Sequence, residues 1–189
     1  VSTTLYNAVL YAELEVTQRA SHSMSVSYVD PSRDAMIAEG ISDFKFVNNY
    51  DTPILIEGYI DSNNQLGFYI YGKDTRDAEH SVEFESETLE TTEYTTKYVE
   101  DTEAEIGSQE TEGAGMDGST ARLWKVTYEN GEEVSREVIN NSTYQTSDVT
   151  VKVGTKSDNA EATKLVREAI TTQDEGKITE AISKASALK

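Results

Sequence analysis

The sequence predicts an α+β protein: one buried N-terminal helix on an antiparallel sheet, then an extended all-β segment and a short C-terminal helical tail. Three observations predict this class. Residues from Ser2 to about Ala12 repeat their apolar side chains with a helical period. The middle of the chain alternates apolar and polar residues between turn signals, and the last thirty residues return to a helical repeat. Eleven tyrosines and only two prolines also favour β-structure.

The N-terminal helix carries two apolar rows at spacings of three and four residues: Leu5, Val9 and Ala12 in one, and Tyr6, Leu10 and Leu14 in the other. Two adjacent rows make a wide apolar face, so we expect this helix to be buried. The chain starts within a helix and offers only Ser2, Thr3 and Thr4 as caps. We therefore expect a fragment or processed product of a longer protein.

Short strands are predicted in the rest of the first segment, at Val16–Arg19, Ser25–Val29, Phe44–Phe46, Pro53–Ile60 and Leu66–Tyr71. The run from Pro53 to Ile60 is almost continuously apolar, which is typical of a central strand covered on both faces. The polar turn at Asp61–Asn64 predicts a hairpin between the last two strands. A polar linker at Lys73–Asp77 ends the segment, so the first domain is predicted at residues 1–72.

A second domain is predicted at residues 78–156, where glutamate and threonine dominate and apolar residues are few. Leu123–Tyr128 and Val134–Ile139 read as paired strands, because Asn130-Gly131 between them is a strong hairpin signal. A helical tail is predicted at residues 157–189. Its first helix, Asn159–Thr171, follows a capping box of Asp158 and Glu161, and its second spans Lys177–Ala187. We interpret it as a hairpin or spacer on the second domain, and a short coiled-coil partner stays open.

A family resemblance covers residues 1–72. The run STTLYNAVLYAELEV, then His22-Ser23, VSYV, P-x-x-DA and DFKFVNNYDTPILI resembles the VanW-like family of Gram-positive cell-envelope proteins. In that family a Gly-rich turn and a Cys-Gln pair precede the Val-Ser-Thr-Thr run, so the resemblance implies an N-terminal truncation. The family usually has glycine where Glu13 stands, and a positive φ at a glutamate would cost about 1 kcal/mol. The family's name refers to vancomycin resistance, which nothing in these residues explains.

A second resemblance covers about residues 78–156. Gly113, then Gly115 or Gly118, are followed by Tyr-x-Asn-Gly-x-x-Val-Ser-Arg-Glu-Val-Ile and by Val-x-Val-Gly-Thr-Lys at Val151–Lys156. This order resembles the five-glycine (G-five) domain of bacterial surface proteins, which often follows a VanW-like segment. The resemblance implies an extended β-module with little core. It also implies binding of polymers that contain N-acetylglucosamine.

The charge and composition limit the partners. Sixteen basic and thirty-five acidic residues give a net charge of −19, which disfavours nucleic acid and anionic membranes. No stretch approaches the ~18 apolar residues of a membrane span. With no cysteine and two histidines, no metal site and no cofactor are predicted. The absence of cysteine fits an extracellular or cell-envelope protein, and a weak homo-oligomer stays open.

One candidate catalytic arrangement follows from the first resemblance. A cysteine before the helix, then His22 and Asp34, would give the Cys-His-Asp order of transglutaminase-like and papain-like enzymes. A cysteine at a helix N-terminus gains thiolate character, and a histidine oriented by a carboxylate serves as its base. Alternatively, His22 bonds the backbone at a strand entrance, and Asp34 is a turn residue paired with Arg33 or Arg19. The alternative is favoured for this chain, because the nucleophile would lie upstream of Val1.

Trp124 and Tyr128 are the candidate ligand-binding residues, because both lie on one strand face and could stack on a sugar ring. The alternative is that Trp124 forms the core of a poorly packed β-module. We therefore expect a secreted or surface-attached, non-catalytic module that binds peptidoglycan or another glycan containing N-acetylglucosamine. The competing hypothesis is a fragment of a cysteine-dependent cell-wall enzyme.

Overall fold

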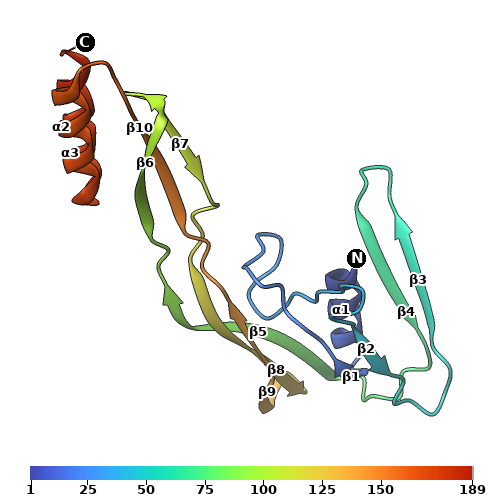
Figure 1. Cartoon of the computed structure of the whole chain (residues 1–189). Coiled ribbons are helices and arrows are strands. Elements are labelled where there is room, and N and C mark those ends of the chain that lie inside the picture. Colours follow the sequence, from blue (N-terminus) through green and yellow to red (C-terminus); the bar gives the residue numbers. More distant parts are fainter. Residues whose placement is uncertain (189) are drawn as a thin grey trace. The chain divides into compact units, whose positions relative to one another are not determined.

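The computed structural model describes residues 1–188, in which three helices and ten strands fall into two units (Figure 1). The first unit combines Val1–Thr92 with Gly118–Gln145, and the second combines Glu93–Asp117 with the chain from Thr146 onward. The predicted α+β class is confirmed. The domain limits predicted at residues 72, 78 and 156 follow sequence order and stay a prediction. None of the helices in residues 1–188 is long and apolar enough to cross a bilayer.

Helix α1, Ser2–Tyr11, begins the first unit and buries the apolar face that its sequence predicts. The helix ends in a Schellman motif. The backbone N–H of Glu13 donates to the Leu10 carbonyl at 2.9 Å, and that of Leu14 donates to the Val9 carbonyl at 3.1 Å. Glu13 has a φ of 51°, in the left-handed region that favours glycine. Glu13 therefore carries the cost of about 1 kcal/mol that a positive φ imposes on a residue other than glycine.

The core of the first unit forms where α1 meets a three-stranded antiparallel sheet. The strands are β5 (His80–Thr92), β8 (Gly118–Glu129) and β9 (Glu132–Tyr144), in the order β5-β8-β9. Phe84 of β5 and Leu123 of β8 are buried in one cluster with Tyr6, Val9 and Leu10 of the helix. The strands that lie before residue 72 form two separate two-stranded sheets. These are β1 (Glu15–Gln18) with β2 (Lys45–Val47), and β3 (Leu55–Ile60) with β4 (Leu66–Tyr71).

The predicted hairpin at Asn130-Gly131 is confirmed. It joins β8 to β9, and its two central residues have φ values of 53° and 80°. Positive φ at both positions is what a type I′ turn requires, and such a turn matches the twist of the strands it connects.

The second unit has its own sheet and core. Strand β10 (Val149–Lys156) lies between β6 (Thr96–Glu105), which is parallel to it, and β7 (Gln109–Glu112), which is antiparallel. Helices α2 (Ala160–Thr171) and α3 (Glu175–Ser186) contribute most of the core side chains. Val153 of β10, Val166 of α2 and Ile178 of α3 are each fully buried. The C-terminal helices therefore complete the hydrophobic core of this unit.

Three local predictions are wrong. Ser25–Val29 is a loop without strand structure, and the preceding Ser23 carbonyl accepts from the Gln145 N–H at 2.7 Å outside any ladder. The strand predicted at Pro53–Ile60 is not covered on both faces: β3 pairs only with β4, and all six of its residues are exposed. The cap of α2 is Asn159 and not Asp158, because the Asn159 carboxamide accepts from the N–H groups of Glu161 and Ala162.

Candidate functional site

The structure brings His22 and Asp34 together in the first unit. Asp34 is completely buried and accepts four hydrogen bonds. One of its oxygens, Oδ1, accepts from Arg19 Nη2 at 2.9 Å and from the Tyr144 hydroxyl at 2.5 Å. The other, Oδ2, accepts from the backbone N–H of His22 at 2.6 Å and lies 2.7 Å from His22 Nδ1. All the acceptor positions of this carboxylate are therefore occupied.

The hydrogen bonds keep Asp34 ionised despite its burial. Burial alone raises the pKa of a carboxyl group. Donation by the Tyr144 hydroxyl, by the backbone N–H of His22 and by the His22 ring Nδ1, together with the charge of Arg19, outweighs that effect and holds the pKa of Asp34 below its ordinary value. Burial and the neighbouring Asp34 raise the pKa of Tyr144, so its hydroxyl keeps its proton.

The contact with Asp34 fixes the orientation of the His22 ring. An ionised carboxylate can only accept, so His22 Nδ1 donates to it, and in a neutral imidazole the lone pair is then on Nε2. The His22 side chain is 31% exposed, and Nε2 has no hydrogen-bond partner in the part of the chain that the structure describes. A histidine held by a carboxylate through one nitrogen, with the other accessible, is arranged as a general base. Asp34 is paired with Arg19 and not with Arg33.

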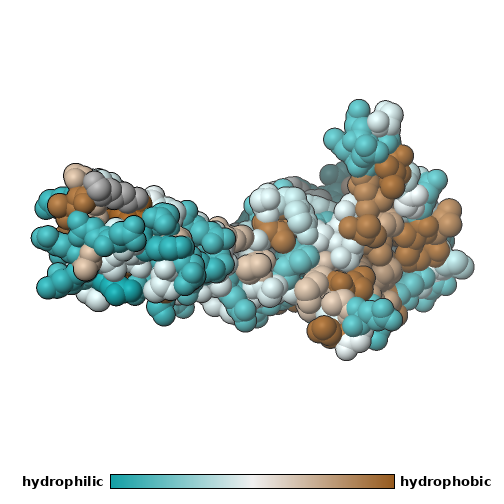
Figure 2. Space-filling view, turned by 45° about the horizontal axis from the view of Figure 1, so that its top comes forward, coloured by the Kyte–Doolittle hydropathy of each residue, from teal (hydrophilic) through white to brown (hydrophobic). Residues whose placement is uncertain are grey.

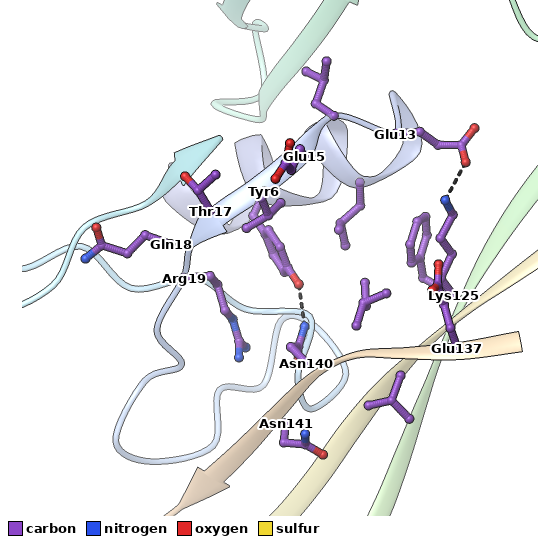
Figure 3. Close-up of a pocket in the computed structure, with 16 residues that line it drawn as sticks. Tyr6, Glu13, Glu15, Thr17, Gln18, Arg19, Lys125, Glu137, Asn140 and Asn141 are labelled. Atoms are coloured by element: carbon purple, nitrogen blue, oxygen red, sulfur yellow. Dashed lines mark hydrogen bonds and ion pairs between the residues drawn. The ribbon is translucent and has the colours of Figure 1, made fainter. Parts of the chain in front are cut away.

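A cavity of about 570 Å³ lies beside α1 in the same unit (Figure 3). Apolar side chains such as Leu10, Leu14 and Phe84 line part of it, and polar groups of β1 and β9 line the rest. Figure 3 shows Glu13 pointing toward Lys125, and Tyr6 pointing toward Asn140, whose amide donates to the Tyr6 hydroxyl at 2.6 Å. The size and the mixed lining are those of a small-ligand site.

A cluster of charged residues at this cavity was missed by sequence reasoning. The Glu13 carboxylate meets Arg76 Nη1 at 2.9 Å, His80 Nε2 at 2.7 Å and Lys125 Nζ at 2.6 Å. The other ring nitrogen of His80 lies 2.7 Å from Glu129 Oε1. These residues come from three distant parts of the chain, at residues 13, 76–80 and 125–129. The sequence signal for this cluster was a glutamate at position 13, where the VanW-like family usually has glycine. The ion pairs of Glu13 help to offset the energetic cost of its positive φ.

We expect the stability of the first unit to depend on pH through this cluster. Burial raises the pKa of Glu13, but bonds from Arg76, Lys125 and His80 outweigh it and lower that pKa to about 2. The bonds from Glu129 and Glu13 raise the pKa of His80. Glu13 therefore contributes stability above its ordinary pKa and loses it as the pH falls toward 2, an effect on the order of 2 kcal/mol. The contribution of His80 is complete below its unfolded pKa of about 6.5 and is lost as the pH rises through its raised value.

The measurement is urea unfolding of the wild type and of His80→Gln at pH 5.5 and 8.5. The wild type should lose stability between these two values, and the variant should lose clearly less. Equal losses in both proteins would contradict the assignment to His80.

Trp124 and Tyr128 lie on β8, at positions that alternate with the buried Leu123 and so face away from α1. The indole N–H of Trp124 donates to Glu87 at 2.6 Å, and the Arg122 guanidinium lies 4.8 Å from the centre of the Trp124 ring. Both aromatic side chains are partly exposed. Neither residue lines the cavity beside α1.

A second aromatic surface lies on the β3-β4 hairpin and was not identified from the sequence. Tyr59 and Tyr69 stack with centroids 5.1 Å apart and planes at 9°, and Tyr71 lies 5.8 Å from Tyr69. The three side chains, here called the tyrosine row, are 41–50% exposed. Gly67 allows this arrangement, because a Cβ there would lie 2.4 Å from the Tyr59 ring. Figure 2 shows apolar side chains exposed over the same hairpin, at the right of the view.

Two family models match the chain. Residues 1–71 match the family described as VanW like protein, and residues 83–156 match the G5 domain. Over 56 residues the chain is 55% identical to the "Uncharacterized protein YoaR" of Bacillus subtilis (strain 168), a stretch that covers 30% of this chain and 18% of that protein. The chain thus spans less than a fifth of that relative's length.

One solved structure, titled "IgA1 Protease G5 domain structure", is similar with a TM-score of 0.31 and 25% identity. The similarity covers 41% of this chain and 94% of that structure.

Proposed function

Because the chain combines a VanW-like segment at residues 1–71 with a G5 domain at residues 83–156, we propose that it is an extracellular module that binds cell-wall glycan. Proteins with these two segments are associated with the cell wall, and G5 domains with glycan binding. The ligand class is peptidoglycan or another polymer that contains N-acetylglucosamine. The protein would be secreted or surface-attached.

The tyrosine row carries this proposal. Sugar rings present an apolar face of C–H groups that stacks on a flat aromatic ring, while their hydroxyls bond polar groups at the edge. Tyr59 and Tyr69 offer two nearly parallel rings, and Tyr71 extends the row and donates to Glu57 at 3.2 Å. Trp124 and Tyr128 are the second surface proposed for the same ligand.

The test is retention of the protein by purified peptidoglycan and by chitin oligosaccharides. We expect Tyr69→Ala to weaken binding about fivefold, since an aromatic contact contributes about 1 kcal/mol beyond its buried area. Trp124→Ala tests the second surface in the same way. Tyr94→Ala is the matched control, because Tyr94 is also 41% exposed but lies outside the row. Wild-type protein that is not retained by either material would reject the proposal.

A second candidate function is supported by the His22–Asp34 contact. Here the chain is part of a cysteine-dependent cell-wall enzyme in which Nε2 of His22 takes the proton from a thiol, and Asp34 orients the ring. The cysteine would come from the Cys-Gln pair that precedes the Val-Ser-Thr-Thr run in VanW-like proteins.

This candidate is tested on a longer protein that includes such a pair. Iodoacetamide should label its cysteine at neutral pH, and His22→Ala should move the onset of labelling toward the pH range of an ordinary thiol. Identical labelling profiles in the two proteins would reject the enzyme hypothesis.

A further inference from the structure

Arg33 differs from the other arginines in its charge environment. The chain has six arginines: Arg19, Arg33, Arg76, Arg122, Arg136 and Arg167. Five of them form an ion pair with a carboxylate, and within residues 1–188 Arg33 forms none. Acidic residues outnumber basic ones by more than two to one in this protein. An arginine that meets no carboxylate in such a chain therefore keeps an uncompensated positive charge.

The Arg33 side chain is held in place by neutral groups. Its Nε donates to Asn7 Oδ1 at 3.0 Å, and the Asn7 amide donates to the Arg33 carbonyl at 2.8 Å. The guanidinium carbon lies 5.8 Å from the centre of the Tyr11 ring, and Nη2 is 3.4 Å from the Tyr11 hydroxyl. Nη1 makes no hydrogen bond to the described residues. The guanidinium is thus oriented without being neutralised, which lowers the entropy cost of binding a ligand.

Arg33 lines a cavity of about 620 Å³. Thr3, Thr4 and Asn7 of α1 form one part of the lining, and the loop from Ser27 to Asp30 forms another. Serine and threonine side chains therefore share this lining with Arg33. The volume of the cavity is in the range of small-ligand sites. The single acidic residue in the lining is Asp30, which is exposed and forms no ion pair with Arg33 within this part of the structure.

We propose that Arg33 binds the carboxylate of a ligand that occupies this cavity, with the hydroxyl of Thr4 as a further donor. A guanidinium presents donors in a fixed fork that matches the two oxygens of a carboxylate. Tyr28 also lines the cavity, and its ring meets the His22 ring edge-on with centroids 6.4 Å apart. A bound ligand would therefore lie beside the His22–Asp34 contact.

The source of the carboxylate rests on the proposed cell-wall function. Peptidoglycan carries carboxylates at the ends of its peptides and on the lactyl group of its muramic acid. We therefore choose two acids as probes, N-acetyl-D-alanyl-D-alanine and N-acetylmuramic acid. Each has a matched neutral probe: the C-terminal amide of the peptide, and N-acetylglucosamine, which lacks the lactyl group.

The experiment follows binding of the four probes to isotope-labelled protein by NMR. At least one acid should bind ten times more tightly than its neutral counterpart, and the acid that binds identifies the source. Arg33→Gln should abolish this preference. Thr4→Glu should also abolish this preference for the acids. Position 4 lies three residues before Asn7 on the same helix face, so the introduced glutamate places its carboxylate beside Arg33. Thr4→Gln, which has the same size without the charge, should retain it.

The Thr4 variants keep the test valid if Arg33→Gln fails to fold, since an acidic residue in the first turn of a helix is favourable. Equal binding of acids and neutral probes by the wild type overturns the proposal, as does an acid preference that survives in Thr4→Glu. Retention by purified peptidoglycan is measured in parallel. If peptidoglycan retains the protein but neither acid binds, the Arg33 site is rejected and the proposed function stands. If an acid binds but peptidoglycan does not retain the protein, the Arg33 site stands and the proposed function is rejected.

Discussion

Asp34→Asn is expected to lower the free energy of unfolding of the first unit by about 3–5 kcal/mol. The wild-type carboxylate neutralises Arg19, whose side chain is only 6% exposed, and accepts from the Tyr144 hydroxyl and from the backbone N–H and ring Nδ1 of His22. An asparagine supplies no charge, and its amide group would face donors. The variant therefore leaves a buried guanidinium without its charge partner, which is among the most costly changes known in protein interiors.

The measurement uses Trp124, the single tryptophan of the chain, which lies in the first unit. Urea unfolding followed by its fluorescence reports on this unit alone, and far-ultraviolet circular dichroism reports mainly on the helices of the second. Asp30→Asn is the matched control: Asp30 is exposed, so the change should stay within about 0.5 kcal/mol. An Asp34→Asn midpoint equal to that of the control would show that the network contributes little.

Gly154→Ala is expected to destabilise the second unit by about 3 kcal/mol. Gly154 lies buried in β10, between β6 and β7. A Cβ at this position would lie 2.2 Å from the Glu105 carbonyl oxygen and 2.4 Å from Ser108 Oγ. The carbonyl belongs to the backbone and cannot rotate away, so the strands must separate. The hydrogen bond of 3.0 Å from the Gly154 N–H to the Ser108 carbonyl would be disturbed as well.

The helical signal at 222 nm should therefore melt at a lower urea concentration in Gly154→Ala, while the Trp124 transition stays unchanged. Gly176→Ala serves as the control in the same unit. A Cβ at residue 176 would lie 3.3 Å from its nearest neighbour, the side-chain oxygen Oδ1 of Asp174. Residue 176 is also exposed, at the start of α3. It should change stability by less than about 1 kcal/mol. A parallel shift of both transitions in Gly154→Ala would contradict a local clash.

Local features of the fold could be predicted from the sequence because short-range chemistry determines them. The apolar rows of α1 and the turn at Asn130-Gly131 are both of this kind. The strand at Pro53–Ile60 was misjudged because an apolar run looks the same whether its faces are covered by protein or left exposed. Only the packing around β3, which the sequence does not state, distinguishes the two cases.

The candidate site could be predicted only in part. His22 and Asp34 are close in sequence and were identified as a pair, although their contact was a matter of order and not of geometry. The hydroxyl of Tyr144 that bonds Asp34 lies 110 residues away, and Lys125 and Glu13 meet across a similar separation. No local pattern encodes such contacts. The charge of Arg33 was visible in the sequence, but its lack of a carboxylate partner is a property of the fold.

The division of the chain has a consequence for how the protein is made. Each unit consists of two stretches, and the chain passes between the units three times, near residues 92, 117 and 145. As the polypeptide leaves the ribosome, the sheet of the first unit stays open until β9 has emerged. By then β6 and β7 have already been synthesised and still await β10, the strand between them. Neither sheet is complete before its last strand is made, so the nascent chain carries two incomplete sheets until β9 and then β10 have emerged.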